Sequence, residues 1–196
     1  MRAVIKLHEI VSDAIVNHTL INSELECGGY LYGCTKRTQD GIEVIVTDAY
    51  YEKIFGTESH FVFGISYFSR AKNYLYEQCN LGRNIRLIGC YHSHGIYPAL
   101  FSQEDRYLQK SWVGNQTTII YSPKYNEMVG DVITRDGEAI EARITTFNKD
   151  VYNLNTISNI AAINNYLDRD LIYNEGDRAL TLKYKPKKRW IISFLF

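Results

Sequence analysis

Hydrophobic and polar residues alternate in short runs along much of this chain, while a few segments repeat their apolar residues at helical spacing. Apolar residues at every second position indicate a strand, and a repeat near 3.6 residues indicates a helix. The pattern predicts strands over 3–10, 29–36, 42–51, 85–93, 117–123, 128–134 and 140–146, and helices over 12–20, 64–80, 103–113 and 157–167. Strands and helices share the chain, which is typical of an α/β protein.

Local signals sharpen several of these boundaries. Ser12 is a good N-cap for the first helix, and Asn80-Leu81-Gly82 supplies a stop for the helix over 64–80. Asp40-Gly41 lies between two runs rich in Tyr, Val and Ile, which predicts a hairpin. From residue 148 the pattern changes, and the tail over 183–196 is basic and then apolar. We therefore expect one domain over residues 1–147 and a C-terminal extension over 148–196, packed on that domain.

Composition adds little to this picture except by exclusion. The 196 residues are 45% hydrophobic, enough for a substantial core. Lys plus Arg equals Asp plus Glu at 22 each, so no global field favours nucleic acid or a membrane surface. No signal-peptide core and no span of 18 apolar residues is visible, which favours a cytoplasmic protein without a membrane span. The four cysteines form no Cys-x-x-Cys pair and are expected to be small buried hydrophobes.

The residues with the clearest chemistry follow the strand predicted over 85–93. His92 and His94 are two residues apart, so both imidazoles leave the same face of that strand. Ser102 and Asp105 are three apart, which places them on one face of the first turn of the next helix. The seven residues between His94 and Ser102 allow that helix to fold back over the strand end. Two imidazoles, one carboxylate and an open fourth position form the pattern of a catalytic zinc site.

A zinc hydrolase also needs a general base that is not a ligand. Glu26 is the best candidate, because it stands before a Gly-rich apolar strand that can pack beside the ligand strand. Gly28, Gly29 and Gly33 permit close approach of the backbone in that strand. Glu24 is a rival, but we treat it as a surface residue.

Together these residues resemble a known family. Glu26, Gly29, Leu31 and Gly33, combined with His92-x-His94-x7-Ser102-x2-Asp105, resemble the motif of the JAMM (MPN+) zinc metalloproteases, which include isopeptidases and deubiquitinases. The resemblance covers residues 1–147 and is specific, since five functional positions are in register. It implies the α/β fold of that family, a mixed, curved, largely antiparallel sheet flanked by helices, with a cytidine-deaminase-like architecture.

The resemblance also implies a role for each residue. His92, His94 and Asp105 would be ligands of one Zn²⁺, with water in the fourth position. Glu26 would take a proton from that water and deliver it to the leaving amine, and Ser102 would donate a hydrogen bond to the oxyanion. The substrate would be the C-terminal glycine tail of a ubiquitin or ubiquitin-like protein, lying along a strand edge in a groove narrow enough to admit only glycines.

Two departures narrow the placement. Gly95 replaces the proline that commonly follows the second histidine, which predicts a looser loop over the zinc. The short segment 94–102 leaves no room for the ubiquitin-holding insertion of the eukaryotic enzymes. The chain is therefore more similar to compact prokaryotic members, some of which belong to antiphage operons. Such a placement implies activating- and conjugating-like enzymes as further partners.

Other interpretations remain at this stage. His92-Ser93-His94 alone could be exposed polar residues, and Ser102 to Asp105 also fits a helix cap, although a cap would itself direct Asp105 toward the site. The alternatives to a protease are a non-catalytic scaffold of the same fold and a zinc hydrolase for another small substrate. A deaminase is disfavoured because its Cys-x-x-Cys ligands are absent. The other histidines are expected at the surface or in ordinary hydrogen bonds: His8, His18 and His60.

Overall fold

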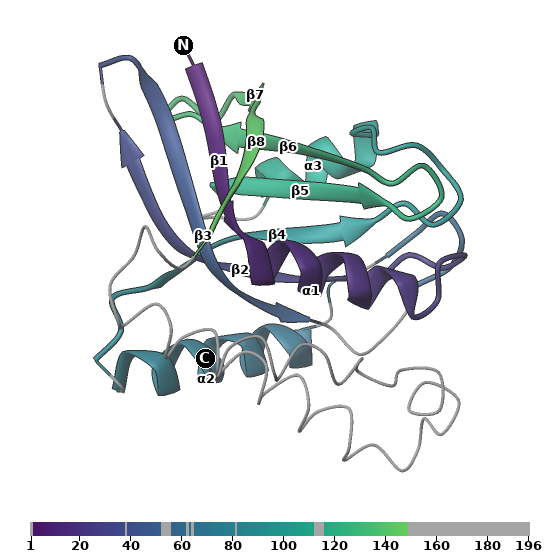
Figure 1. Cartoon of the computed structure of the whole chain (residues 1–196), viewed down its shortest axis with the longest axis horizontal. Coiled ribbons are helices and arrows are strands. Elements are labelled where there is room, and N and C mark those ends of the chain that lie inside the picture. Colours follow the sequence, from purple (N-terminus) through teal and green to yellow (C-terminus); the bar gives the residue numbers. More distant parts are fainter. Residues whose placement is uncertain are drawn as a thin grey trace.

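The computed structural model describes residues 2–37, 39–51, 56–61, 63, 65–80, 82–111 and 116–148. Three helices and eight strands lie within these residues (Figure 1). In chain order they are β1 (Arg2–His8), α1 (Glu9–Leu20), β2 (Gly28–Arg37), β3 (Gly41–Tyr51), α2 (Ile65–Asn80), β4 (Arg86–Ser93), α3 (Gln103–Ser111), β5 (Thr117–Ser122), β6 (Glu127–Ile133), β7 (Ala139–Glu141) and β8 (Arg143–Phe147).

All the described strands belong to one sheet, in the order β7-β6-β5-β4-β2-β3-β1-β8. Four neighbouring pairs are antiparallel, while β1–β3, β1–β8 and β4–β5 are parallel. The expected α/β class and mixed, curved sheet are confirmed, with a small antiparallel majority. The hairpin of β2 and β3 is also as predicted, since Arg37 lies opposite Ile42 across the turn.

The strand predicted over 140–146 is wrong as a single element. The structure divides it into β7 and β8, which lie at opposite ends of the strand order. Ala142 is the residue between them, and its backbone N–H donates to the carbonyl of Gly130 on β6 at 2.8 Å. The curved sheet therefore nearly closes on itself. The alternation of apolar and polar residues predicts an extended backbone but not the strand with which it pairs. It therefore gives no sign that the pairing changes at this point, from β6 for β7 to β1 for β8.

The first helix begins three residues earlier than predicted. The strand expected over 3–10 ends at His8, whose Nδ1 accepts the backbone N–H of Ile10 at 3.3 Å and caps α1 in place of Ser12. The early start turns Val11 and Ile15 into the core, where both are fully buried. Burial of these side chains thus outweighs the intrinsic preference of serine for the cap position.

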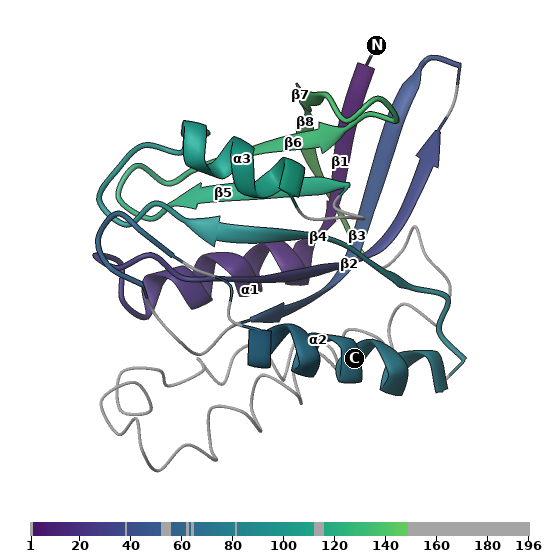
Figure 2. The same ribbon diagram turned by 180° about the vertical axis from the view of Figure 1, so that it is seen from behind.

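Helices cover both faces of the sheet. Figure 1 shows α1 in front of the sheet, and the reverse view in Figure 2 brings α3 to the front. The core on the α1 side includes Leu7, Val11, Ile15, Leu31, Tyr91 and Ile119. A second, aromatic cluster joins β2 and β3 to α2, and includes Tyr30, Tyr32, Tyr50, Ala71 and Tyr74. The central strands β2 and β4 therefore send side chains into two separate environments.

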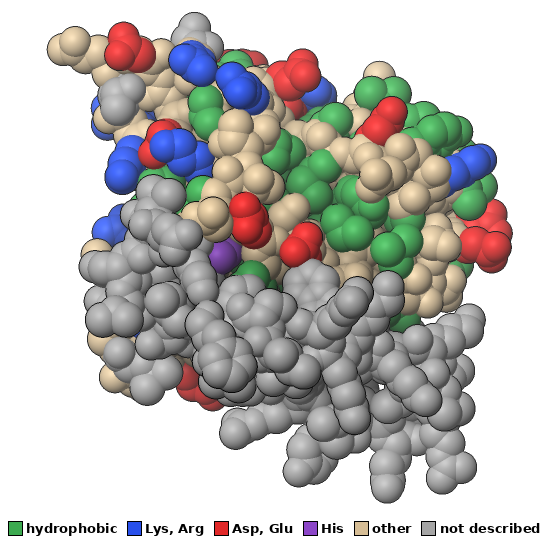
Figure 3. Space-filling view, viewed as in Figure 1, with side chains coloured by type: hydrophobic (Ala, Val, Ile, Leu, Met, Phe, Trp, Pro, Cys, Tyr) green, Lys and Arg blue, Asp and Glu red, His purple; other side chains and the backbone are tan. Residues whose placement is uncertain are grey.

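The predicted boundary after residue 147, the helix over 157–167 and the tail over 183–196 lie at or beyond the limit of the described residues. None of the described helices is long and apolar enough to cross a membrane. On the face shown in Figure 3, acidic and basic side chains intermingle at the upper left, and hydrophobic side chains gather toward the right.

Candidate functional site

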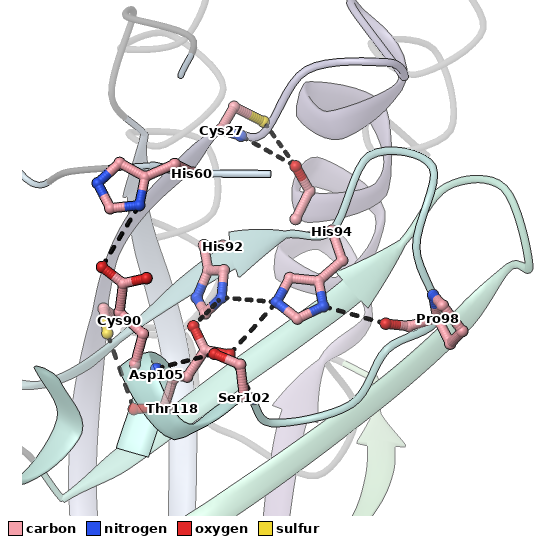
Figure 4. A network of polar contacts seen from close by, with 11 residues as sticks. Cys27, His60, Cys90, His92, His94, Pro98, Ser102, Asp105 and Thr118 are labelled. Atoms are coloured by element: carbon pink, nitrogen blue, oxygen red, sulfur yellow. Dashed lines mark hydrogen bonds and ion pairs between the residues drawn. The ribbon is translucent and has the colours of Figure 1, made fainter. Parts of the chain in front are cut away.

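The C-terminal end of β4 and the start of α3 bring three ligand-type side chains to one point. His92 lies near the end of β4, His94 follows that strand, and Asp105 lies in the first turn of α3 (Figure 4). The Nε2 atoms of the two histidines are 3.2 Å apart. The Asp105 carboxylate places Oδ1 3.0 Å from His92 Nε2 and Oδ2 3.4 Å from His94 Nε2.

These separations fit a single tetrahedral metal ion. Ligand atoms about 2.0–2.1 Å from zinc at tetrahedral angles lie roughly 3.3–3.4 Å from one another. The 3.2 Å between the two Nε2 atoms is close to this value. The 3.0 and 3.4 Å contacts of Asp105 involve its two different oxygens, so around an ion one of these oxygens turns toward both imidazoles. Two nitrogens and one carboxylate oxygen also leave a fourth position open, as catalytic zinc sites require. The three side chains, His92, His94 and Asp105, can hold a metal ion.

A contact in the loop after β4 fixes the state of one candidate ligand. His94 Nδ1 lies 3.0 Å from the backbone carbonyl oxygen of Pro98. A carbonyl can only accept, so Nδ1 carries the proton and Nε2 keeps its lone pair in the neutral ring. Orientation of a histidine ligand by a carbonyl behind it is the usual second shell of a metal site.

The loop over this site is closely packed, contrary to the expectation drawn from Gly95. The backbone N–H of His94 donates to the carbonyl of Tyr121, and that of Tyr97 donates to the carbonyl of His94, both at 3.0 Å. Gly95 is buried, and a Cβ there would lie 2.5 Å from the backbone oxygen of Glu24. Glycine thus permits close backbone approach rather than a loose loop. The Glu24 side chain itself is exposed, as predicted.

Ser102 and Asp105 form reciprocal contacts at the start of α3. The Ser102 backbone N–H donates to Asp105 Oδ2 at 2.7 Å, and the Asp105 N–H donates to Ser102 Oγ at 3.1 Å. This arrangement is a capping box with aspartate in the acidic position. The cap and the metal cluster coexist, because the same carboxylate accepts from Ser102 and faces both imidazoles. Ser102 Oγ still has its own proton to donate into the pocket.

Glu26 lines the same pocket as the three ligand candidates and is 6% exposed. Burial raises its pKa to about 7 from an ordinary value of 4.5. The positive charge of His94 opposes that rise, while the carboxylates of Asp105 and Glu104 add to it. A carboxyl group with a pKa near neutrality can both accept and return a proton at working pH.

A pair of hydrogen bonds, which the sequence did not reveal, holds Glu26 in register with the histidines. The backbone N–H of Cys27 donates to Ser93 Oγ at 2.9 Å, and the N–H of Ser93 donates to the Cys27 carbonyl at 2.7 Å. Ser93 is fully buried between His92 and His94 in the sequence. In the sequence, the position of Ser93 between two candidate ligands indicates that it lies close to the site. Its hydrogen-bond partner, Cys27, follows from the pairing of β2 with β4.

Electrostatics favour a cation where the three side chains meet. Burial alone would raise the pKa of Asp105, but hydrogen bonds from His92 and His94 hold it well below its usual range. Burial lowers the pKa of His94, yet the contacts with Asp105 and Pro98 outweigh that effect and raise it overall. The carboxylate is therefore ionised, and its charge attracts either protons or a metal ion to the imidazoles.

A pocket of about 610 Å³ opens beside this cluster. One side is an aromatic wall, which we define as Tyr30, Phe61, Phe63 and Phe68. The Tyr30 ring centroid lies 5.3 Å from that of Phe63 and 6.0 Å from that of Phe68, and the Phe61 and Phe63 centroids are 5.0 Å apart. The narrow groove expected to admit only the glycines of a substrate tail stays a prediction.

The residues assigned no role have mostly structural positions. His8 caps α1 and His18 Nδ1 contacts the hydroxyl of Tyr91 at 2.8 Å, so both are buried hydrogen-bonded histidines. His60 is exposed, with Nδ1 3.4 Å from Glu104 Oε1 at the pocket (Figure 4). Among the cysteines, Cys27 and Cys90 are buried as predicted and burial raises the pKa of both thiols; Cys34 is half-buried, and Cys79 is exposed, which corrects that prediction.

Comparisons with known proteins agree with this geometry at the level of family and fold. The model of the family described as prokaryotic homologs of the JAB domain matches residues 8–140. Among solved structures, the solution structure of protein DSY2949 from Desulfitobacterium hafniense is similar, with a TM-score of 0.55 and 21% sequence identity. The match covers 74% of this chain and 94% of that one. No curated protein is significantly similar in sequence.

Proposed function

The chain belongs to the prokaryotic homologs of the JAB domain, and we propose that it is a zinc-dependent peptidase or isopeptidase. Its substrate in this proposal is the C-terminal glycine tail of a ubiquitin or ubiquitin-like protein. One observation carries the proposal: His92, His94 and Asp105 meet at spacings that suit a tetrahedral ion, and Glu26 lines the same pocket. Binding alone would not require a buried carboxyl group beside the ligands.

In this proposal His92, His94 and Asp105 hold the metal through Nε2, Nε2 and a carboxylate oxygen. When bound, zinc supplies Lewis acidity and makes a water molecule acidic near neutral pH. The hydrogen bond from His94 Nδ1–H to Pro98 orients the ring and leaves Nε2 to face the metal position. The cap formed by Ser102 holds the Asp105 carboxylate toward the imidazoles.

Glu26 moves the proton during hydrolysis. Its carboxylate accepts a proton from water as the water oxygen bonds to the scissile carbonyl carbon. It then donates that proton to the amine nitrogen as the C–N bond breaks, leaving a carboxylate and an amine. The Ser102 hydroxyl donates a hydrogen bond to the carbonyl oxygen while negative charge gathers there. Burial raises the pKa of Glu26 to about 7 in the metal-free protein, which supports its role as a group that accepts and returns a proton.

The wider setting follows from the family and from the compact loop between β4 and α3. A tail-processing enzyme of this size suits either precursor processing or deconjugation of a ubiquitin-like protein in the cytoplasm. Activating- and conjugating-like enzymes encoded nearby would be its functional partners, as in an antiviral defence system. Identification of a ubiquitin-like protein among the gene neighbours would test this part of the proposal.

A cleavage assay tests the activity. Zinc-loaded protein is incubated with ubiquitin-like proteins fused or conjugated through their C-terminal glycines, with and without a chelator. We expect chelator-sensitive cleavage that falls by about 10²–10⁴-fold in Glu26→Gln, while zinc content is retained. Glu24→Gln, an exposed carboxylate two residues away, is the matched control and should keep full activity. Cleavage unaffected by chelation or by Glu26→Gln would contradict the mechanism, and no cleavage of any substrate would favour a scaffold.

A further inference from the structure

The aromatic wall lies on the same side of the site as Glu26. The backbone N–H of Glu26 donates to the carbonyl of Thr57 at 2.8 Å, and the N–H of Gly56 donates to the Glu26 carbonyl at 2.7 Å. These two bonds attach the segment 56–61, and with it Phe61, directly to the residue that would protonate the leaving amine. A leaving segment that takes its proton from Glu26 would therefore pass next to Phe61.

The sheet itself helps to place the wall there. Gly28 lies opposite His92 in the pairing of β2 with β4. A Cβ on Gly28 would lie 2.8 Å from Phe61 Cε1 and 2.5 Å from the backbone oxygen of Tyr91. The missing side chain lets the phenylalanine ring sit against the strand at the level of the ligand histidine. Tyr30 continues the same face two residues further along β2.

The apolar chemistry of the aromatic wall suits a part of the substrate other than its glycine tail. Glycine offers no side chain, and the stem of a lysine is a thin chain that makes few contacts with the surface of an aromatic ring. Aromatic rings gain most from contact with another large apolar group. An aromatic or long aliphatic side chain suits the space between the wall and the α3 side of the pocket, where Leu108 lies.

The strand that carries the candidate ligands, β4, has no free edge near them to which a substrate could add as a further strand. At His92, β4 already pairs with Gly28 of β2 on one side and with Ile120 of β5 on the other. Ser93 likewise pairs with Tyr121. The expected docking of an extended tail along a strand edge therefore has no free edge on β4. Backbone pairing to β4 therefore cannot supply selectivity next to the ligands.

We propose, on the basis of the function proposed above, that the aromatic wall binds a bulky apolar side chain on the residue directly after the scissile bond. The favoured substrates are then linear precursors in which the glycine tail is followed by phenylalanine, leucine or a residue of similar size. Conjugates through a lysine side chain are poorer substrates, because they leave the wall without a partner. Apolar pockets of this kind discriminate between side chains by the area they bury.

Equilibrium binding of leaving-segment peptides tests the proposal without relying on catalysis. The probes are eight-residue peptides with a free N-terminus that differ only in the first residue, which is Phe, Leu, Ala or Asp. Calorimetric titration into the full-length protein, with and without zinc, should show Phe and Leu peptides binding at least tenfold more tightly than Ala, about 1.4 kcal/mol. Equal affinities, or no binding by any peptide, would overturn the proposal.

Substitutions test whether the aromatic wall causes the preference for Phe and Leu peptides. Phe63→Ala should reduce the preference for Phe over Ala to less than threefold, whereas Tyr76→Ala, an exposed aromatic on α2 outside the pocket, should leave it unchanged. If Phe63→Ala fails to fold, Ser59→Trp decides, because Ser59 is exposed at the pocket and tolerates a larger side chain. Ser59→Trp should weaken binding of the Phe peptide more than binding of the Ala peptide. An unchanged preference for Phe in this variant would contradict the proposal.

A cleavage arm separates this proposal from the one on which it rests. Ubiquitin fusions carry Gly-Gly followed by Phe, Leu, Ala or Asp, and a lysine-linked conjugate is included. Faster chelator-sensitive cleavage of the Phe and Leu fusions supports both proposals. Chelator-sensitive cleavage of all these substrates at equal rates overturns the proposal that the wall selects the residue after the cut. It leaves the proposed peptidase activity standing. If the Phe peptide binds more tightly but no substrate is cleaved in a chelator-sensitive reaction, the proposed peptidase activity is overturned. The proposal that the wall binds an apolar side chain then stands.

Discussion

At the scale of single residues, Glu26 is a carboxyl group whose surroundings favour its protonated form. It is buried and feels the carboxylates of Asp105 and Glu104, so its pKa rises to about 7. Asp105, a few side chains away in the same pocket, has its pKa shifted in the opposite direction by two imidazole donors. Two carboxyl groups with opposite shifts in one pocket are suited to different tasks, one as ligand and one as proton carrier.

This shift predicts a pH-dependent stability for the metal-free protein. Unfolded Glu26 loses its proton near pH 4.5 and folded Glu26 near 7, so the folded state binds more protons between these values. Its contribution to stability is fully present below about pH 4.5 and is lost as the pH rises to about 7. Urea unfolding of wild-type and Glu26→Gln protein from pH 4.5 to 7.5 should show the wild type losing stability relative to the variant. Parallel curves would contradict the assignment.

Ser93 gives a second prediction at the residue scale. Ser93→Ala leaves the buried N–H of Cys27 without its acceptor, and an unpaired buried donor costs about 1–3 kcal/mol. We expect urea unfolding to show a loss of this size, together with slower cleavage, since Glu26 adjoins Cys27. Ser111→Ala, at an exposed serine near the end of α3, should change the free energy of unfolding by less than about 0.5 kcal/mol. Similar stability of the two variants would refute the proposed role of Ser93.

At the scale of elements, α2 is fixed to the sheet by a buried polar cluster. Asp48 on β3 is fully buried and accepts from Arg83, which follows α2, and from the hydroxyl of Tyr74 at 3.2 Å. Arg83 also donates to Gln78 near the end of the helix. Because α2 carries Phe68, this cluster also supports one edge of the aromatic wall.

Removal of the arginine should therefore be costly. Arg83→Ala leaves a carboxylate in the interior without its cation, and breaking a buried pair in this way costs about 3–5 kcal/mol. Lys6→Ala removes the partner of Glu43 in a partly exposed pair and should cost less than about 1 kcal/mol. Thermal and urea unfolding of both variants provide the measurement. Comparable losses in the two variants would show that the Asp48 cluster does not anchor α2.

The sequence predicts most elements because hydrophobic periodicity reports burial directly. The β2–β3 hairpin, α2, β4 and the start of α3 lie within one or two residues of their predicted positions. The early start of α1 and the break at Ala142 were missed, because both depend on what the chain packs against. A histidine cap and a change of strand partner leave no trace in local periodicity.

At the scale of the whole molecule, the pairing of β2 with β4 and the short connection from β4 to α3 bring distant segments together at one site. Glu26 precedes β2, the histidines end β4 and Asp105 begins α3, and all of them line one pocket. The sequence predicts these residues as site candidates, because metal binding restricts which residue types can serve as ligands and how far apart they lie in the chain. The aromatic wall could not be foreseen, because its four members come from three separate segments and carry no chemical signature in the sequence.

We propose that this pocket holds a catalytic zinc ion on His92, His94 and Asp105. Zinc K-edge X-ray absorption on the purified protein measures the ligands of that ion. We expect about one zinc per chain, surrounded by nitrogen and oxygen ligands at about 2.0–2.1 Å with no sulfur near 2.3 Å, and loss of that zinc in His94→Ala. A protein that binds no zinc, or that holds it through cysteine sulfur, would refute this metal site.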